Sequence, residues 1–162
     1  MKEFKFKIDN AISLPSSISN GIEAISFHKA KHGQIDILYL HLCNGQTLKI
    51  EADINTVSSS SWYEIGTLKF KIGKYADSKE NLNLLNENWK KIKSFEVLQL
   101  IDPDDEGGLL AESGFVITNC INEELIIVCG AYPMTIQINA PFYNDDFEPE
   151  YDLIDYKREA YN

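Results

Sequence analysis

The sequence contains little cysteine, and its cysteines do not form a pattern that would hold a small protein together. The 162 residues include three of them, Cys43, Cys120 and Cys129. An odd and low number of cysteines is not typical of a disulfide framework. We therefore expect a reduced protein that works in the cytoplasm.

Long apolar runs are missing as well. The first ten residues, MKEFKFKIDN, alternate apolar and charged side chains, whereas a secretory signal needs an unbroken apolar core. No stretch approaches the roughly 18 consecutive apolar residues that predict a membrane-spanning helix. The sequence predicts neither a secreted nor a membrane protein, and the length favours one domain over residues 1–162.

Positive charge is absent from a large part of the chain. Residues 1–93 hold 13 lysines and 10 acids, whereas residues 94–156 hold 14 acids and neither lysine nor arginine. The formal net charge of −10 therefore comes from one contiguous stretch. Such a balance argues against nucleic acid or an anionic membrane as a partner, because both need a basic surface. It favours an acidic surface that attracts a basic protein.

The acids are densest in the segment FYNDDFEPEYDLIDYK, residues 142–157. Six carboxylates are candidates for contact with a basic partner: Asp145, Asp146, Glu148, Glu150, Asp152 and Asp155. Aromatic residues alternate with them, and we expect Phe147 and Tyr151 to point inward and Tyr143 to point outward as an anchor for the partner. In the alternative interpretation, the acids pair internally with lysines of the first half, such as Lys69 or Lys71.

A second acidic stretch, DPDDEGGLLAES, covers residues 102–113. Four of its acids are further candidates for partner binding: Asp102, Asp104, Asp105 and Glu106. The alternating acids and the glycine at the sixth position resemble the start of a calcium-binding loop, but the twelfth position is Ser113 and not the closing glutamate. A small enzyme or a calcium-dependent module that uses this loop is the alternative function.

Motifs of catalysis and metal binding are lacking. The chain has no H-E-x-x-H, no C-x-x-C and no G-x-S-x-G, and no lysine follows the Gly107-Gly108 pair as it would in a phosphate loop. We therefore expect no metal, no cofactor and no enzymatic activity.

Alternation of apolar and polar residues dominates the rest of the sequence. In LKFKI, Leu68, Phe70 and Ile72 fall on one face and two lysines on the other, which predicts a half-buried strand. Similar patterns predict strands at residues 4–8, 22–29, 35–42, 46–53, 95–101, 114–120, 123–129 and 134–140. The pair Asn44-Gly45 predicts a tight hairpin turn between two of these strands.

Helical signals are fewer. Leu82, Leu85, Trp89 and Ile92 recur at helical spacing after a possible cap at Asp77, which predicts a principal helix over residues 78–92. The tail YDLIDYKREAY is a weaker helical candidate. Together these patterns predict a mainly β (α+β) fold, with about eight strands in an antiparallel sheet or sandwich and one packed helix.

The acid-rich runs NDDFEPEYDLID and DPDDEGG, the small size and the missing catalytic motif give the chain the character of a known group. It resembles the immunity proteins of bacterial polymorphic or contact-dependent toxin systems. This resemblance implies a non-enzymatic inhibitor that binds a basic toxin domain of the nuclease type, with carboxylates in place of nucleic-acid phosphates.

Overall fold

The computed structural model describes residues 4–6, 8, 13–58, 62–75, 80–102 and 109–160, with only the backbone at 4–6, 57–58, 62–63 and 102. The strands in this part are β1 (Phe4–Phe6), β2 (Ile22–Lys29), β3 (Ile35–Leu42), β4 (Thr47–Ser58), β5 (Trp62–Gly73), β6 (Asn83–Leu84), β7 (Ile92–Asp102), β8 (Leu109–Asn119), β9 (Glu124–Cys129), β10 (Ile136–Asn139) and β11 (Tyr156–Ala160). Its helices are α1 (Leu14–Ile18) and the 3₁₀ turns η2 (Glu87–Lys90) and η3 (Leu153–Asp155). No helix of the described residues is long and apolar enough to cross a membrane.

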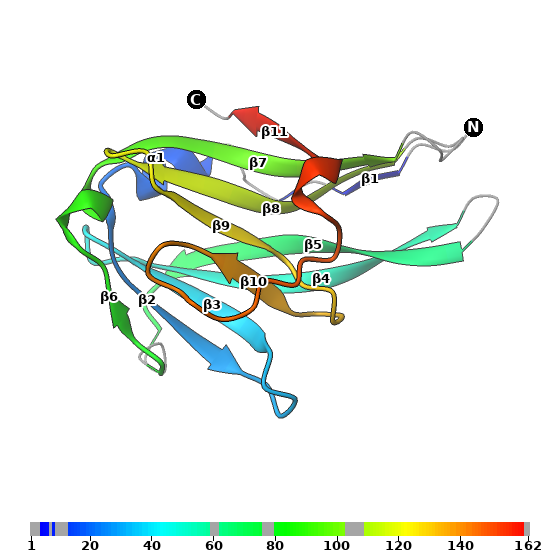
Figure 1. The fold of residues 1–162 in the computed structure, drawn as a ribbon, viewed down its shortest axis with the longest axis horizontal. Helices are drawn as coiled ribbons and strands as arrows, with labels where there is room; N and C mark the ends of the chain where they lie inside the picture. Colours follow the sequence, from blue (N-terminus) through cyan, green and yellow to red (C-terminus); the bar gives the residue numbers. More distant parts are fainter. Residues whose placement is uncertain are drawn as a thin grey trace.

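The strands form one continuous sheet that folds back on itself. The order is β11-β7-β8-β9-β10-β3-β2-β6, with β4 added to β3 and β5 added to β4. All these pairs are antiparallel, and among the strands of the described residues β1 alone pairs in parallel, with β8. Figure 1 shows the result as two layers, with β7, β8 and β9 above β2, β3, β4 and β5. The mainly β fold is confirmed, and of the two predicted forms, an antiparallel sheet or a sandwich, the structure has one antiparallel sheet that folds into two layers.

The bend lies where β10 meets β3. β10 is only four residues long, and it pairs with β3 through a single residue pair, Ile136 with Ile35. Along the other edge of β10, four residue pairs join it to β9. A short strand with one pair on one side lets the sheet turn sharply while its remaining backbone groups stay bonded to β9.

The main core fills the space between the two layers. Leu38 and Leu40 of β3 enter it from one layer, and Phe115 of β8 and Ile127 of β9 enter it from the other. The alternate residues of the same upper strands, among them Val116 and Ile126, are also buried, but in a second cluster. β8 and β9 therefore bury apolar side chains on both faces, and both faces need a cover.

The predicted principal helix over residues 78–92 is wrong. Residues 76–79, which include the expected cap Asp77, lie outside the described residues, and the rest forms β6, η2 and the start of β7. The backbone there bonds to β2: the Phe27 N–H donates to Glu80 O at 3.1 Å, and the Leu85 N–H donates to Glu23 O at 3.0 Å. The open edge of β2 supplies partners that a free helix would have to find within itself.

Asparagine side chains explain why residues 80–92 pair with the sheet instead of forming a regular helix. Asn81 adopts a left-handed φ of 48°, and its side-chain amide donates to Phe27 O at 3.0 Å. The Asn86 side chain accepts from the Asn88 N–H at 3.0 Å and caps the short η2 turn. Asparagine bonds to nearby backbone groups in this way and therefore competes with a regular helix.

The helical prediction for the tail is also wrong. Residues 156–160 form β11, which pairs with β7 from Tyr156 with Leu100 to Ala160 with Glu96. Without this strand, the outer edge of β7 would leave a row of backbone groups unpaired. The tail therefore satisfies the sheet edge rather than its own helical hydrogen bonds.

The strand and turn predictions are confirmed in position, but some bounds differ: β10 covers Ile136–Asn139 of the predicted 134–140, and β4 continues past residue 53 to Ser58. β2 and β3 span residues 22–29 and 35–42 as expected, and the hairpin after β3 turns at Gly45, whose φ is +86°. In β5, Leu68 is buried whereas Lys69 and Lys71 are exposed. The faces of Phe4 and Phe6 lie outside the described side chains.

Truncation of two side chains from the predicted helix over residues 78–92, Trp89 and Leu82, tests this fold. Trp89 is 1% exposed, and its ring contacts Phe142 edge-on at 5.5 Å, whereas Leu82 is 46% exposed. We expect Trp89→Ala to lower the free energy of unfolding by about 3–5 kcal/mol and Leu82→Ala to change it by less than about 1 kcal/mol. Denaturant titration measures both values. Equal losses would contradict the fold, because a regular helix would bury both side chains on one face.

Candidate functional site

The acidic segment, residues 142–155, links β10 to β11 and is tied to the end of β9 by backbone contacts. Its Pro149 forms an antiparallel bridge with Gly130, and the Glu150 N–H donates to Cys129 O at 2.9 Å. The Ala131 N–H donates to Glu148 O, also at 2.9 Å. Figure 1 shows this orange-to-red part of the chain rising from β10 to β11. The acids therefore lie on a segment with a defined path.

Aromatic side chains hold the acidic segment against the sheet. Phe147 and Tyr151 pack against the second apolar cluster, as predicted, together with Leu153. Tyr156, at the start of β11, belongs to the same cluster and contacts Tyr151 edge-on at 6.4 Å between ring centroids. The aromatics cover the outer face of β8 and β9, and the acids between them are left on the solvent side.

Tyr143 does not project outward as predicted. Its ring packs against the main core and meets Phe27 edge-on at 5.9 Å. Its hydroxyl donates to Asp145 Oδ2 at 2.9 Å. Burial first, and then this bond to the Asp145 carboxylate, raises the pKa of Tyr143. Tyr143 is therefore half-buried and orients Asp145 through its hydroxyl. Its ring points inward because it packs against the main core, as the ring of the preceding Phe142 does.

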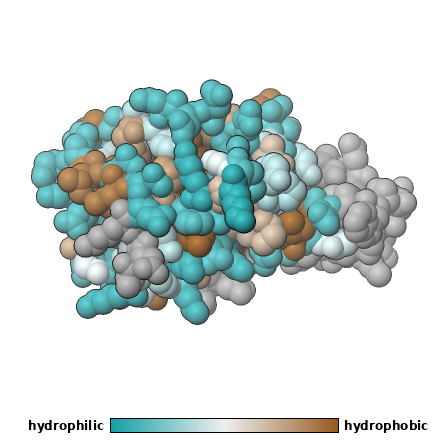
Figure 2. Space-filling view, turned by 90° about the horizontal axis from the view of Figure 1, so that it is seen from below, coloured by the Kyte–Doolittle hydropathy of each residue, from teal (hydrophilic) through white to brown (hydrophobic). Residues whose placement is uncertain are grey.

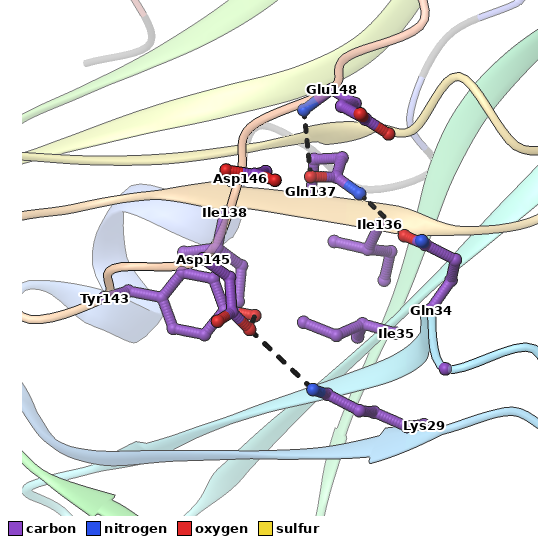
Figure 3. Close-up of a pocket in the computed structure, with 11 residues that line it drawn as sticks. Lys29, Gln34, Ile35, Ile136, Gln137, Ile138, Tyr143, Asp145, Asp146 and Glu148 are labelled. Atoms are coloured by element: carbon purple, nitrogen blue, oxygen red, sulfur yellow. Dashed lines mark hydrogen bonds and ion pairs between the residues drawn. The ribbon is translucent and has the colours of Figure 1, made fainter.

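Three of the predicted acids line one cavity. Asp145, Asp146 and Glu148 stand along one wall, Lys29 at the end of β2 lies below them, and Gln34 and Gln137 close the other side (Figure 3). The cavity has a volume of about 320 Å³, and isoleucines of β3 and β10 form part of its lining. The tertiary structure therefore brings the turn between β2 and β3, strand β10 and the acidic segment together around one opening.

Two amide side chains fix the wall of this cavity. The Gln137 Nε2 donates to Gln34 Oε1 at 3.0 Å, and the Glu148 N–H donates to Gln137 Oε1 at 3.0 Å (Figure 3). Gln137 is 9% exposed, so its amide is almost fully enclosed by these contacts. This chain of hydrogen bonds positions the backbone of Glu148 relative to the turn after β2.

The acids at the cavity are poorly neutralised. Lys29 Nζ lies 3.7 Å from Asp145 Oδ2, and the two side chains are 41% and 63% exposed. An exposed pair at this distance contributes little to stability. Among the described residues this is the only ion pair to the acidic segment, and Lys69 and Lys71 make none with it. The alternative of internal pairing therefore accounts for one of the six acids.

Glu150 differs from the other five acids. Both of its carboxylate oxygens accept from the Gly66 N–H at 3.1 Å, and the side chain is partly buried beside Cys129. Burial raises the pKa of Glu150, and the bond from Gly66 opposes that shift. Glu150 therefore accepts from an edge N–H of β5 and is less exposed than the other five acids, and its predicted role in partner binding stays a prediction.

Asp152 and Asp155 are exposed and continue the acidic surface toward β11. The four candidates of the other loop are placed less fully. The backbone of Asp102 ends β7 and pairs with Leu109, so strands flank the loop as predicted. Asp104, Asp105 and Glu106 lie outside the described residues, and the calcium alternative stays a prediction.

The histidines bond to groups other than metals. His41 lies between Ser26 at 2.7 Å and Thr47 at 3.3 Å, and His28 Nδ1 lies 2.7 Å from Asp36 Oδ1. Within the described ranges, no group of three or more His, Cys, Asp or Glu side chains is arranged to hold a metal ion.

Sequence reasoning missed the loop between β9 and β10, residues 130–135. Tyr132 and Met134 are each 54% exposed there, next to the acidic segment. The alternation of Met134, Ile136 and Ile138 placed Met134 in the predicted strand 134–140, so the pair Tyr132-Pro133 was the only available signal for this loop. The face seen from below in Figure 2 is mostly hydrophilic, and its hydrophobic residues form small separate patches.

Comparisons with known proteins place no relative beside this chain. No family model, no curated protein and no solved structure matches it.

The role of Glu150 is tested by its dependence on pH. Because its pKa is raised in the folded chain, its proton stabilises the fold fully below the ordinary value of 4.5, and this contribution is lost as pH rises through the folded pKa. Glutamine does not titrate. We therefore expect the stability of Glu150→Gln, relative to that of the original chain, to increase as pH rises from 4.5 through the folded pKa of Glu150. Glu150→Ala should lose about 1–3 kcal/mol at neutral pH, because the Gly66 N–H loses its partner. Denaturant titrations from pH 4 to pH 8 measure these differences, and a constant offset for Glu150→Gln would contradict this role.

Proposed function

We propose that this chain is a non-enzymatic protein-binding domain, an immunity-like inhibitor that binds a basic toxin domain of the nuclease type through its acidic surface. The observation that carries the proposal is the excess of exposed carboxylates at the cavity wall. Asp145, Asp146 and Glu148 stand around one opening, and Lys29 is their only cationic neighbour in the described lining.

Charge and shape together support this function. A nuclease must hold nucleic-acid phosphates on a basic surface. Carboxylates on a fixed segment present the same sign of charge to that surface, speed encounter and contribute about 1.5–7 kcal/mol per close pair in favourable interfaces. The hydrogen bonds of Gln137 to Gln34 and Glu148 hold the acidic segment in place before the partner binds, and so does the packing of Phe147 and Tyr151 against the second cluster. This order reduces the entropy lost on binding.

The remaining features agree with such a role. The formal net charge of −10 disfavours nucleic acid and anionic membranes as direct ligands. All three cysteines are free thiols in the structure, which suits a reducing compartment such as the cytoplasm.

Neutralising the cavity wall tests the charge mechanism. We expect the triple variant Asp145→Asn, Asp146→Asn, Glu148→Gln to keep its unfolding free energy, because exposed acids of one sign contribute little to it. Its affinity for a short peptide that alternates arginine and glycine should fall about tenfold or more at low salt, and the difference should shrink at about 0.15 M salt. Fluorescence anisotropy of the labelled peptide measures the affinity.

A matched control separates this surface from net charge. The variant Glu23→Gln, Glu80→Gln, Glu87→Gln changes three exposed acids elsewhere, so both triple variants carry a formal net charge of −10 + 3 = −7. The control should bind the peptide nearly as the original chain does. Equal losses in the two variants would place the effect in the overall charge and contradict a dedicated surface.

The inhibitory role has a separate test. We expect the gene for this chain to lie beside the gene of a large secreted toxin, and co-expression of the chain to protect bacterial cells from the basic domain of that toxin. Two results would count against the proposal. One is that the toxin domain kills the cells equally well with and without co-expression of this chain, and the other is that the neighbouring genes form a metabolic operon.

A further inference from the structure

The loop between β9 and β10 is closed by hydrogen bonds and exposes two apolar side chains, Tyr132 and Met134. The Gly130 N–H donates to Thr135 O at 2.8 Å and closes the loop, and the Thr135 hydroxyl donates to Tyr132 O at 2.5 Å inside it. The acidic segment holds it from outside through the Gly130–Pro149 bridge. A loop fixed at both ends and from one side keeps its exposed side chains in one arrangement.

Backbone strain accompanies this exposure. Met134 has a φ of +59°, in the left-handed region that side chains other than those of glycine, asparagine and aspartate rarely adopt. The strained residue is nevertheless 54% exposed, so its side chain recovers little packing within the chain. Strained residues that a surrounding structure holds in place cluster at binding sites.

An aromatic stack extends the loop toward the acidic cavity. The ring of Tyr132 lies 4.4 Å from the ring of His32 at an angle of 36°. The two residues that follow His32, Gly33 and Gln34, line the acidic cavity. Tyr132 therefore lies next to the turn that forms the side of the cavity opposite Asp145, Asp146 and Glu148.

Acids also lie on the other side of the loop. A second cavity, of about 200 Å³, has Pro133 and Met134 on one side and the β4–β5 hairpin on the other. Asp53 and Glu64 of the hairpin line it and are exposed. An apolar centre between two acidic borders has the layout of a protein interface, in which buried anchors are surrounded by polar contacts.

We infer that this loop, with Tyr132 and Met134 as its contacts, is the apolar anchor of the acidic surface and binds an apolar side chain of the basic partner that lies between cationic ones. The inference rests on the proposed function and specifies the partner's chemistry: alternating cationic and apolar residues rather than positive charge alone. Charge complementarity on both sides of the loop selects this occupant over a second copy of the same acidic chain.

Two matched peptides test the anchor. One alternates arginine and glycine, and the other has the same arginines with two glycines replaced by leucine. We expect the original chain to bind the leucine peptide about tenfold more tightly, because Tyr132 and Met134 bury the leucines. The variant Tyr132→Ser, Met134→Asn should lose this difference and keep its affinity for the arginine–glycine peptide. Asparagine tolerates the left-handed backbone, so the loop keeps its shape.

A control variant and a measurement of mass complete the experiment. Leu82→Ser, Ile121→Ser removes two apolar side chains of similar exposure, 46% and 53%, and should keep the tenfold difference. A difference that survives in Tyr132→Ser, Met134→Asn, or one that is absent from the original chain, would overturn the anchor while the acidic surface stands. Failure of both peptides to bind would overturn the proposed function and the anchor together.

Sedimentation velocity tests the other possible occupant, a second copy of this chain. If the chain self-associates and the variant Tyr132→Ser, Met134→Asn does not, the loop is a contact between copies and the inference is overturned.

Discussion

Apolar side chains on both faces of β8 and β9 are the constraint on which the rest of the structure depends. Phe115 and Ile127 face the main core, whereas Val116 and Ile126 face the other way. The folded-back layer of β2 to β5 covers the first face. The second face would be open to water, at a cost of roughly 25 cal/mol for each Å² of apolar surface, without the aromatics of the acidic segment.

This constraint decides where the acids lie. Phe147 and Tyr151 must point into the second cluster, so the acids between and beside them are turned toward solvent or toward the neighbouring loop. Glu150 is the exception, because the segment passes the edge of β5 at Gly66 and an edge N–H there needs an acceptor. A segment that first serves as a cover for the sheet thereby becomes a fixed acidic surface.

The same edge shows how closely the two layers are joined. At Gly66 the N–H donates to Glu150, and the carbonyl accepts from the Ser113 hydroxyl of β8 at 2.6 Å. A side chain at this position would meet the Cys129 side chain at 3.0 Å, so glycine allows the close approach. The β4–β5 hairpin is thus held against β8, β9 and the acidic segment, and the acidic borders of the β9–β10 loop are carried by elements that are locked together.

The sequence by itself determined the strands, the hairpin turn and the acidic character of residues 94–156. Alternation over β2, β3 and β5 is a local pattern, because adjacent residues of a strand face opposite sides wherever the strand lies. The tertiary structure decided the rest. Residues 80–92 have helical spacing, yet the edge of β2 offers them backbone partners, and the tail joins β7 for the same reason. The grouping of Lys29, Gln34, Gln137 and the acids around one cavity depends on the bend between β10 and β3, and no local pattern records a contact between residues about a hundred positions apart.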